Sequence, residues 1–246
     1  MVTLASSDKL VYCGIGVAST TYPKTLGNYY MRLISCSGVL AADLFNLSIF
    51  SQIWLIDNKI LSREETASDP NTYFSPMAVN VKSNGYDLLV IPERAQVLLQ
   101  GRSGHEAELF LRILGGIAKN LPHTPYQGAG FNFDYVIPVS DANVLKRVRS
   151  CFMPENSPIS ADFLSNDARF GFYVSQDIDD SLRLRLDIKP AIINNADSIV
   201  LKFNVHREMN KAPTQQIEDF FNRFEELDNK CRDIADKINA FIVRGE

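Results

Sequence analysis

Apolar residues near the C-terminus recur every three or four positions through four heptads. Positions 217, 220, 224, 227, 231, 234, 238 and 241 all carry Ile, Phe, Leu or Cys. This spacing places all eight side chains on one stripe of a single long helix. A stripe of this size has to be buried, either on a sheet of the same chain or against another subunit.

Both interpretations of the stripe stay open at this stage. A coiled coil or partner helix would use these residues as its interface: Phe220, Phe224, Leu227, Ile234, Ile238 and Phe241. Docking on the chain's own sheet is favoured, because Phe is bulky for a two-stranded seam and Phe221 and Ile242 widen the stripe. We expect the end from Ile234 onward to be the part best placed to reach a neighbour.

Alternation with a period of two residues predicts the strands of the second half. Residues 182–188 alternate strictly between apolar and charged side chains, and residues 199–206 alternate in the same way. Residues 129–139 and 169–177 are also predicted as strands, with a short helix at 141–151. Such alternation is typical of antiparallel sheets that have one solvated face.

The first half has the same order of elements. Asn84 and Gly85 lie between two apolar runs and predict a hairpin with a type I′ turn, in which both central residues have positive φ. A strand at 95–100 and a helix at 105–121 are expected to follow.

The start of the chain is less regular. Strands are expected at 10–18 and 43–56, and residues 23–41 fit a helix or a strand equally well. Residues 61–77 are polar and carry Pro breakers, which predicts a loop.

Together these elements predict an α+β fold in which antiparallel sheets grip helices and a long helix ends the chain. Residues 1–123 and 124–246 are predicted as two β-rich halves, each ending in a helix. Their shared order of elements fits two related strand–strand–strand–helix units or a coincidence of pattern equally well, since their residues do not repeat one for one. No flexible linker separates the halves, so we expect them to pack as one unit.

Composition narrows the class of protein. The chain has 246 residues, and its net charge of -4 argues against the basic excess of a general nucleic-acid binder. The four cysteines form no CxxC pair, and no apolar run approaches about 20 residues. The first residues lack the charged start and apolar run that predict a signal peptide. We expect a cytoplasmic protein that does not span a membrane.

No set of residues demands a particular reaction. The three histidines, His105, His123 and His206, share no metal-ligand spacing, and neither a GxSxG motif nor a P-loop occurs. The acidic turn at 177–180 is better explained by the turn preference of Asp than by a metal. We therefore predict no catalytic residue, no metal and no cofactor.

Two segments are candidate binding sites. Arg102, Ser103 and Gly104 lead into a predicted helix, whose N-terminal N–H groups attract anions, although a simple N-cap explains them better. If strands 182–188 and 199–206 are neighbours, a mostly basic face results. That face would carry Arg183, Arg185, Lys189, Lys202 and His206.

The leading hypothesis is a non-enzymatic interaction protein that acts through contact with a partner protein or with a second copy of itself. The alternative is a helix-grip-like domain that binds a small apolar ligand, in which the sheet grips a helix around an apolar cavity that the 15 Phe and nine Tyr could line. A hydrolase or nuclease is the third and weakest hypothesis. Nucleic acid is a weakly supported partner, since only Tyr173 lies in phase to stack a base on the basic face.

Overall fold

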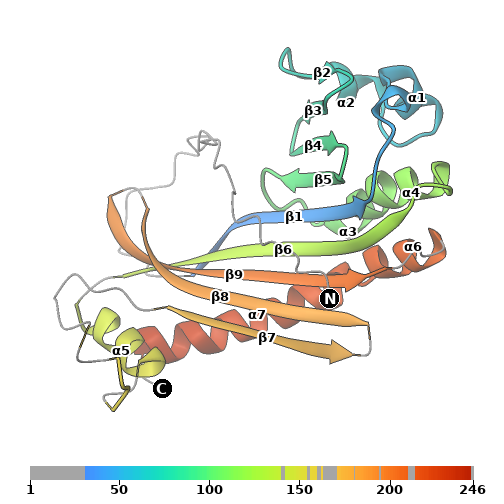
Figure 1. The fold of residues 1–246 in the computed structure, drawn as a ribbon. Helices are drawn as coiled ribbons and strands as arrows, with labels where there is room; N and C mark the ends of the chain where they lie inside the picture. Colours follow the sequence, from blue (N-terminus) through green and yellow to red (C-terminus); the bar gives the residue numbers. More distant parts are fainter. Residues whose placement is uncertain are drawn as a thin grey trace.

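The structure, a computed structural model, describes residues 31–139, 142–153, 156–159, 162, 171–179, 181–193, 195–209 and 214–244. Within these residues one nine-stranded antiparallel sheet carries its helices mainly against one face (Figure 1). The strand order is β2–β3–β4–β5–β1–β6–β9–β8–β7. The predicted α+β class with an antiparallel sheet is confirmed.

The first half begins with β1 (Arg32–Ala42) and ends with a helical segment. Between them lie η1 (Leu47–Ile49), α1 (Gln52–Asp57), α2 (Arg63–Ala67), β2 (Tyr73–Phe74), β3 (Val79–Ser83), β4 (Tyr86–Ile91) and β5 (Arg94–Leu99). The predicted helix at 105–121 is present as α3 (Glu106–Phe110), the π-helical η2 (Leu111–Gly115) and α4 (Gly116–Asn120).

The second half begins with β6 and ends with the long helix. Its elements are β6 (Tyr126–Pro138), α5 (Ala142–Phe152), β7 (Phe172–Asp179), β8 (Leu182–Ile193), β9 (Ala196–Glu208), α6 (Thr214–Asn222), α7 (Phe224–Asn239) and η4 (Ala240–Arg244). The boundary drawn at residue 123 falls between α4 and β6.

The two halves share one connectivity. In each half the first strand pairs with the last strand of the meander that follows, β1 with β5 and β6 with β9. The halves meet where β1 pairs antiparallel with β6, for example at Gly38 opposite Phe131. They therefore form a single sheet with one continuous hydrophobic core.

The predicted strand at 43–56 is wrong. Leu47, Phe50 and Leu55 are buried, and their spacing of three and five residues suits short helical turns. The Ser51 side chain caps α1 by accepting a hydrogen bond from the Trp54 N–H. The apolar block is thus helical, and the strand predicted at 10–18 lies outside the described residues.

The loop predicted at 61–77 contains two short elements. Ser62 and Glu65 form a reciprocal capping box that starts α2, and β2 pairs with β3. The ambiguous stretch before residue 42 is resolved as the strand β1 over its described part.

The hairpin at Asn84 and Gly85 is confirmed, but its turn type is not. Ser83 pairs with Tyr86 across a two-residue loop. Gly85 has φ of 98°, whereas Asn84 has a negative φ. A type I′ turn requires positive φ at both positions, so Gly85 alone supplies the left-handed residue, as in a type II turn.

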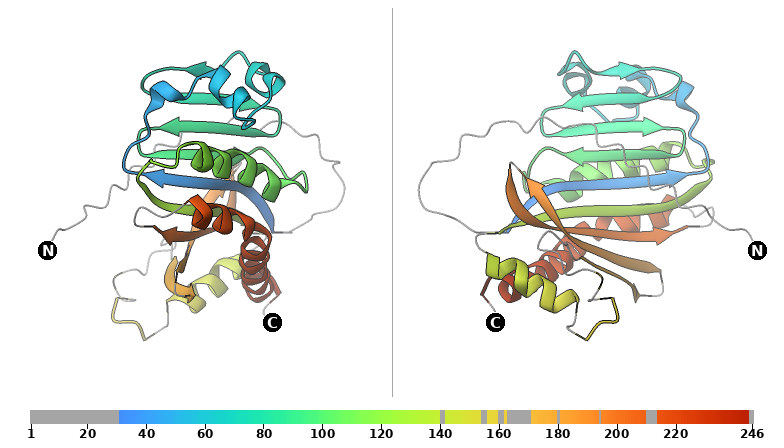
Figure 2. Two further views of the ribbon diagram at one scale, coloured as in Figure 1. Left: turned by 90° about the vertical axis from the view of Figure 1, so that its right-hand side faces the viewer. Right: turned by 60° about the vertical axis from the view of Figure 1, so that its left-hand side comes forward.

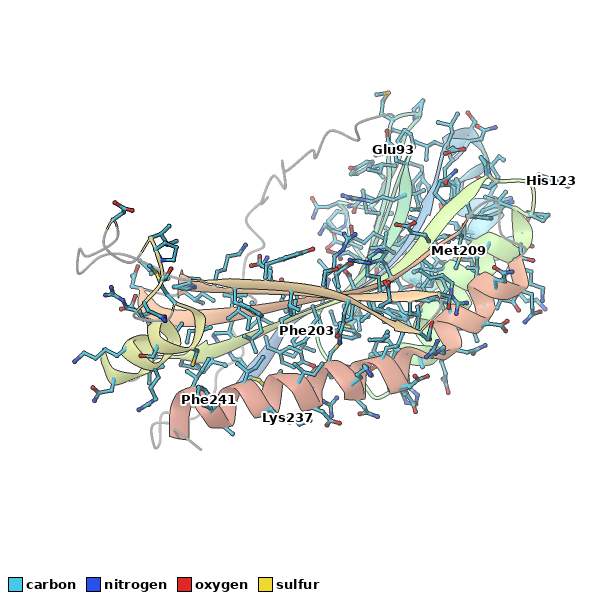
Figure 3. All side chains as sticks on the ribbon, turned by 60° about the horizontal axis from the view of Figure 1, so that its bottom comes forward. Glu93, His123, Phe203, Met209, Lys237 and Phe241 are labelled. Atoms are coloured by element: carbon cyan, nitrogen blue, oxygen red, sulfur yellow. The ribbon has the colours of Figure 1, made fainter. Side chains whose placement is uncertain are left out.

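The long C-terminal helix is confirmed, with one interruption. Arg223 separates α6 from α7, and its guanidinium binds Asp179 at 2.9 Å and Glu226 at 2.7 Å. The helices α3–α4 and α6–α7 lie on the same face of the sheet (Figure 2). In Figure 3 side chains fill the space between α7 and the strands, with Phe203 pointing into it and Lys237 facing away.

Candidate binding surface on the open face of the sheet

The C-terminal stripe lies against the chain's own sheet. Phe220 and Leu227 are completely buried and Phe224 is 2% exposed. Ile234 and Ile238 are partly buried against the same core. Of the six candidate interface residues only Phe241, 49% exposed, is largely available to a partner.

The segment Arg102–Gly104 is already occupied by a carboxylate of the same chain. Glu106 accepts hydrogen bonds from the backbone N–H groups of Ser103 and Gly104. Burial raises the pKa of Glu106, but these hydrogen bonds outweigh it and lower that pKa. The Arg102 guanidinium binds Asp228 at 2.6 Å and also lies 3.8 Å from Glu106. The N–H groups that an external anion would need are therefore already bonded.

The five residues predicted as a basic face do lie on one face, because β8 pairs with β9. Arg183 stands opposite His206, and Asp187 stands opposite Lys202. Arg185 and Lys189 share this face through the period of two. It is the face opposite the helices, and we call it the open face.

The positive charge of the open face is mostly compensated. Arg183 binds Asp177 at 3.0 Å, Lys202 binds Asp134 at 3.4 Å, and Lys189 binds Asp187 at 2.5 Å. Asp187 lies on β8 itself, whereas Asp134 and Asp177 come from the neighbouring strands β6 and β7 and meet these bases only in the folded sheet.

The other two of the five basic residues are His206 and Arg185. His206 is half-buried, and burial followed by the nearby Arg185 charge lowers its pKa, so it is neutral at pH 7. Arg185 forms no ion pair with the described residues and stands opposite Asn204 and Ser175. The open face is thus close to neutral, with Arg185 as its exposed cation.

A line of polar side chains crosses the middle strands of the open face. Asn132 donates to the Ser37 hydroxyl at 3.2 Å and accepts from Asn204 at 2.9 Å. The Asn204 side chain then contacts His206 Nδ1 at 2.9 Å. These groups satisfy one another, so the surface is ordered without a ligand.

The outer strand β7 differs from every other long strand. It pairs only with β8 within the described residues and ends the sheet on that side (Figure 1). Phe172, Tyr173 and Val174 are 43%, 61% and 38% exposed. Neighbouring β8 instead buries Leu182 and Leu184. The sequence predicted a strand here, but nothing in its pattern marked that strand as an edge.

A shallow depression of about 670 Å³ lies at the β7–β8 turn. Asp177 and Arg183 line it together with His206 and Glu208. The acids of the turn are held by arginines, Asp177 by Arg183 and Asp179 by Arg223. Asp180 lies outside the described residues, and no group of three or more metal-ligating side chains occurs in the part that the structure describes.

The chain was compared with protein-family models, curated proteins and solved structures, and nothing matches. No helix among the described residues is long and apolar enough to cross a bilayer.

Proposed function

We propose that this chain is a non-enzymatic interaction protein that binds an extended segment of a partner protein along the outer edge of β7. The observation that carries the proposal is the exposure of β7 at the edge of a large sheet whose other long strands are each paired on both sides within the described residues. A strand edge presents backbone N–H and C=O groups that can pair with an added strand.

The chemistry of β7 supports this use. Natural edge strands are commonly protected by Lys, Pro or very short length. β7 has eight residues, FYVSQDID, with neither Lys nor Pro. Its two acidic residues are neutralised by Arg183 and Arg223. Exposed apolar side chains at Tyr173 and Val174 offer contacts for the side chains of an added strand.

A partner segment suits this edge better than a second copy of β7. Antiparallel pairing of two β7 strands about their centre would place the apolar residues 172–174 of one copy opposite the acidic end of the other. A heterologous strand can instead match apolar residues to the apolar end. Self-association is therefore a distinct outcome of the test.

Binding is favoured over catalysis because the polar groups of the open face are engaged with one another. The alternative, a small apolar ligand held between the sheet and its helices, has less support. The Phe side chains between sheet and helices pack together, with Phe131 centred 5.0 Å from Phe220 and 5.2 Å from Phe224. Such rings fill the core rather than line a cavity.

The experiment is a selection of displayed random peptides against the protein, followed by affinity measurement with three proteins. Tyr173→Lys places a charge on the edge, and Ile192→Lys makes the same change at a 74% exposed position of β8. We expect selected peptides with alternating apolar residues to bind the wild type and Ile192→Lys equally, and Tyr173→Lys at least about tenfold more weakly.

Two results would contradict the proposal. The first is selected peptides that bind Tyr173→Lys as tightly as the wild type. The second is a dimer in light scattering that Tyr173→Lys converts to a 27.6 kDa monomer, because the edge would then serve a second copy of the chain.

A further inference from the structure

A second pocket, separate from β7, lies between the start of β1, β6 and α7. Its volume is about 290 Å³. The lining residues are Met31, Leu33, Arg102, Tyr135, Arg232 and Asp236. Two arginines, one carboxylate and one phenol thus surround a space with an apolar side formed by Met31 and Leu33.

Tyr135 is the unusual member of this group. The residue is 3% exposed, and its hydroxyl is buried without a hydrogen-bond partner. Burial raises the pKa of Tyr135, so the hydroxyl keeps its proton and remains a donor. The nearby Arg232 side chain lowers that pKa, but because a guanidinium can only donate, it leaves the hydroxyl proton without an acceptor. Buried polar groups are nearly always paired, so an unpaired hydroxyl that lines a pocket indicates a missing acceptor.

The two arginines are fixed side by side by one buried carboxylate. Arg102 and Arg232 each donate to a different oxygen of Asp228, both at 2.6 Å. Asp228 is only 4% exposed, and Arg102 also lies 5.6 Å from the centre of the Phe224 ring. Each guanidinium has five N–H donors, so both retain donors beyond those used by Asp228. This arrangement is preorganised for an anionic group with two oxygens.

The lining also carries a negative charge. Asp236 stands on the same helix as Arg232, one turn further along. With Asp228 behind the arginines and Glu106 3.8 Å from Arg102, the carboxylates outnumber the two arginines, which disfavours a simple anion. A ligand with one anionic and one cationic group adds no net charge and can use both the arginines and Asp236.

We propose that this pocket binds a small zwitterion, an α-amino acid with an apolar side chain. Its carboxylate accepts hydrogen bonds from Arg102, Arg232 and the Tyr135 hydroxyl. Its ammonium group faces Asp236, and its side chain lies on Met31 and Leu33. The inference does not depend on the proposed role of β7.

The test is isothermal titration calorimetry of the full chain with leucine and phenylalanine as probes. Leucinamide lacks the carboxylate and N-acetyl-leucine lacks the cation, and both serve as controls. We expect saturable binding of at least one free amino acid and loss of binding for both blocked forms. No heat from either amino acid at millimolar concentration would overturn the proposal, as would equal binding of leucinamide.

A pair of Tyr→Phe variants separates a ligand role from a structural one. Tyr126 is buried like Tyr135, but its hydroxyl donates to the Leu121 carbonyl at 3.0 Å. Tyr135→Phe should weaken amino-acid binding about tenfold and leave the ligand-free melting temperature unchanged or higher. Tyr126→Phe should lower the melting temperature and leave binding unchanged. Unaltered binding to Tyr135→Phe would contradict the assignment.

Discussion

The covered and open faces of the sheet carry successive residues of the same strands, but different forces hold them. On β6, Phe131 and Phe133 are completely buried under the helices, whereas Asn132 and Asp134 face the open side. The covered face depends on dense, non-directional packing. The open face depends on directional hydrogen bonds and ion pairs between strands. A substitution on one face should therefore have a different size and character from its neighbour on the other.

The largest contrast is expected between Phe131→Ala and Asn132→Ala. Phe131 contacts five other Phe rings, so its truncation should lower the free energy of unfolding by about 3–5 kcal/mol. Asn132→Ala removes two side-chain hydrogen bonds and should cost about 1–2 kcal/mol. Urea denaturation of both variants measures the difference. Equal losses would mean that the two faces contribute alike.

Gly38→Ala tests how closely the covered face is packed. A Cβ at Gly38 would lie 2.6 Å from a ring carbon of Phe110, so strand and helix must move apart. The expected cost is about 1–3 kcal/mol. Gly101→Ala is the matched control, because nothing lies within 4 Å of its added Cβ, and its effect should stay within about 0.5 kcal/mol. A stable Gly38→Ala variant would show that the interface between β1 and α3 is loose.

The smallest expected effect is on the pH dependence of stability, to which the carboxyl groups of Glu65 and Asp134 should contribute with opposite signs. On the helix side of the sheet, the Glu65 carboxylate accepts two hydrogen bonds from Arg112, at 2.7 and 3.0 Å, and one from Tyr86 at 2.8 Å. Burial raises the pKa of Glu65, but these hydrogen bonds outweigh it and lower that pKa. On the open face, burial raises the pKa of Asp134 more than Lys202 lowers it.

The signs follow from linkage. Glu65 adds stability above its unfolded pKa near 4.5, and that stability is lost as pH falls through the lower folded pKa. Asp134 has the reverse sign, since its ionisation costs more in the folded protein and protonation relieves that cost.

At pH 7 Glu65→Gln should destabilise the protein by about 1 kcal/mol or less, and Asp134→Asn should be neutral or stabilising. The difference in stability between each variant and the wild type should shrink in acid, which thermal unfolding from pH 7 to pH 3 would measure. Parallel pH profiles of the two variants would contradict the opposite signs of Glu65 and Asp134.

Much of the second half was predictable because its strands alternate without interruption. The pattern of residues 182–188 needs only the period of a strand to assign each side chain to a face. Residues 43–56 failed because a mixed apolar run fits either a strand or a short helix, and the Ser51 cap decides between them. Asn84 shows the same limit, since a favourable dipeptide does not determine both φ angles.

The candidate sites depended more on tertiary structure. The basic residues of β8 and β9 share a face as expected, but their counter-ions come from β6 and β7, and no local pattern predicts which acid faces which base. Arg102 illustrates this most clearly. Its sequence context suggested an anion site at a helix start, whereas its partner Asp228 lies 126 residues away.

The sequence by itself determined which side chains face the core, because the periods of 2 and 3.6 residues are local properties of the backbone. It therefore identified the α+β class, the covered side of the strands and the apolar stripe of the last helix. Only the tertiary structure decided that β7 is an edge, that most of the basic face is neutralised, and that Tyr135 meets two arginines. Those features depend on strand order and on contacts between distant segments, which local periodicity does not encode.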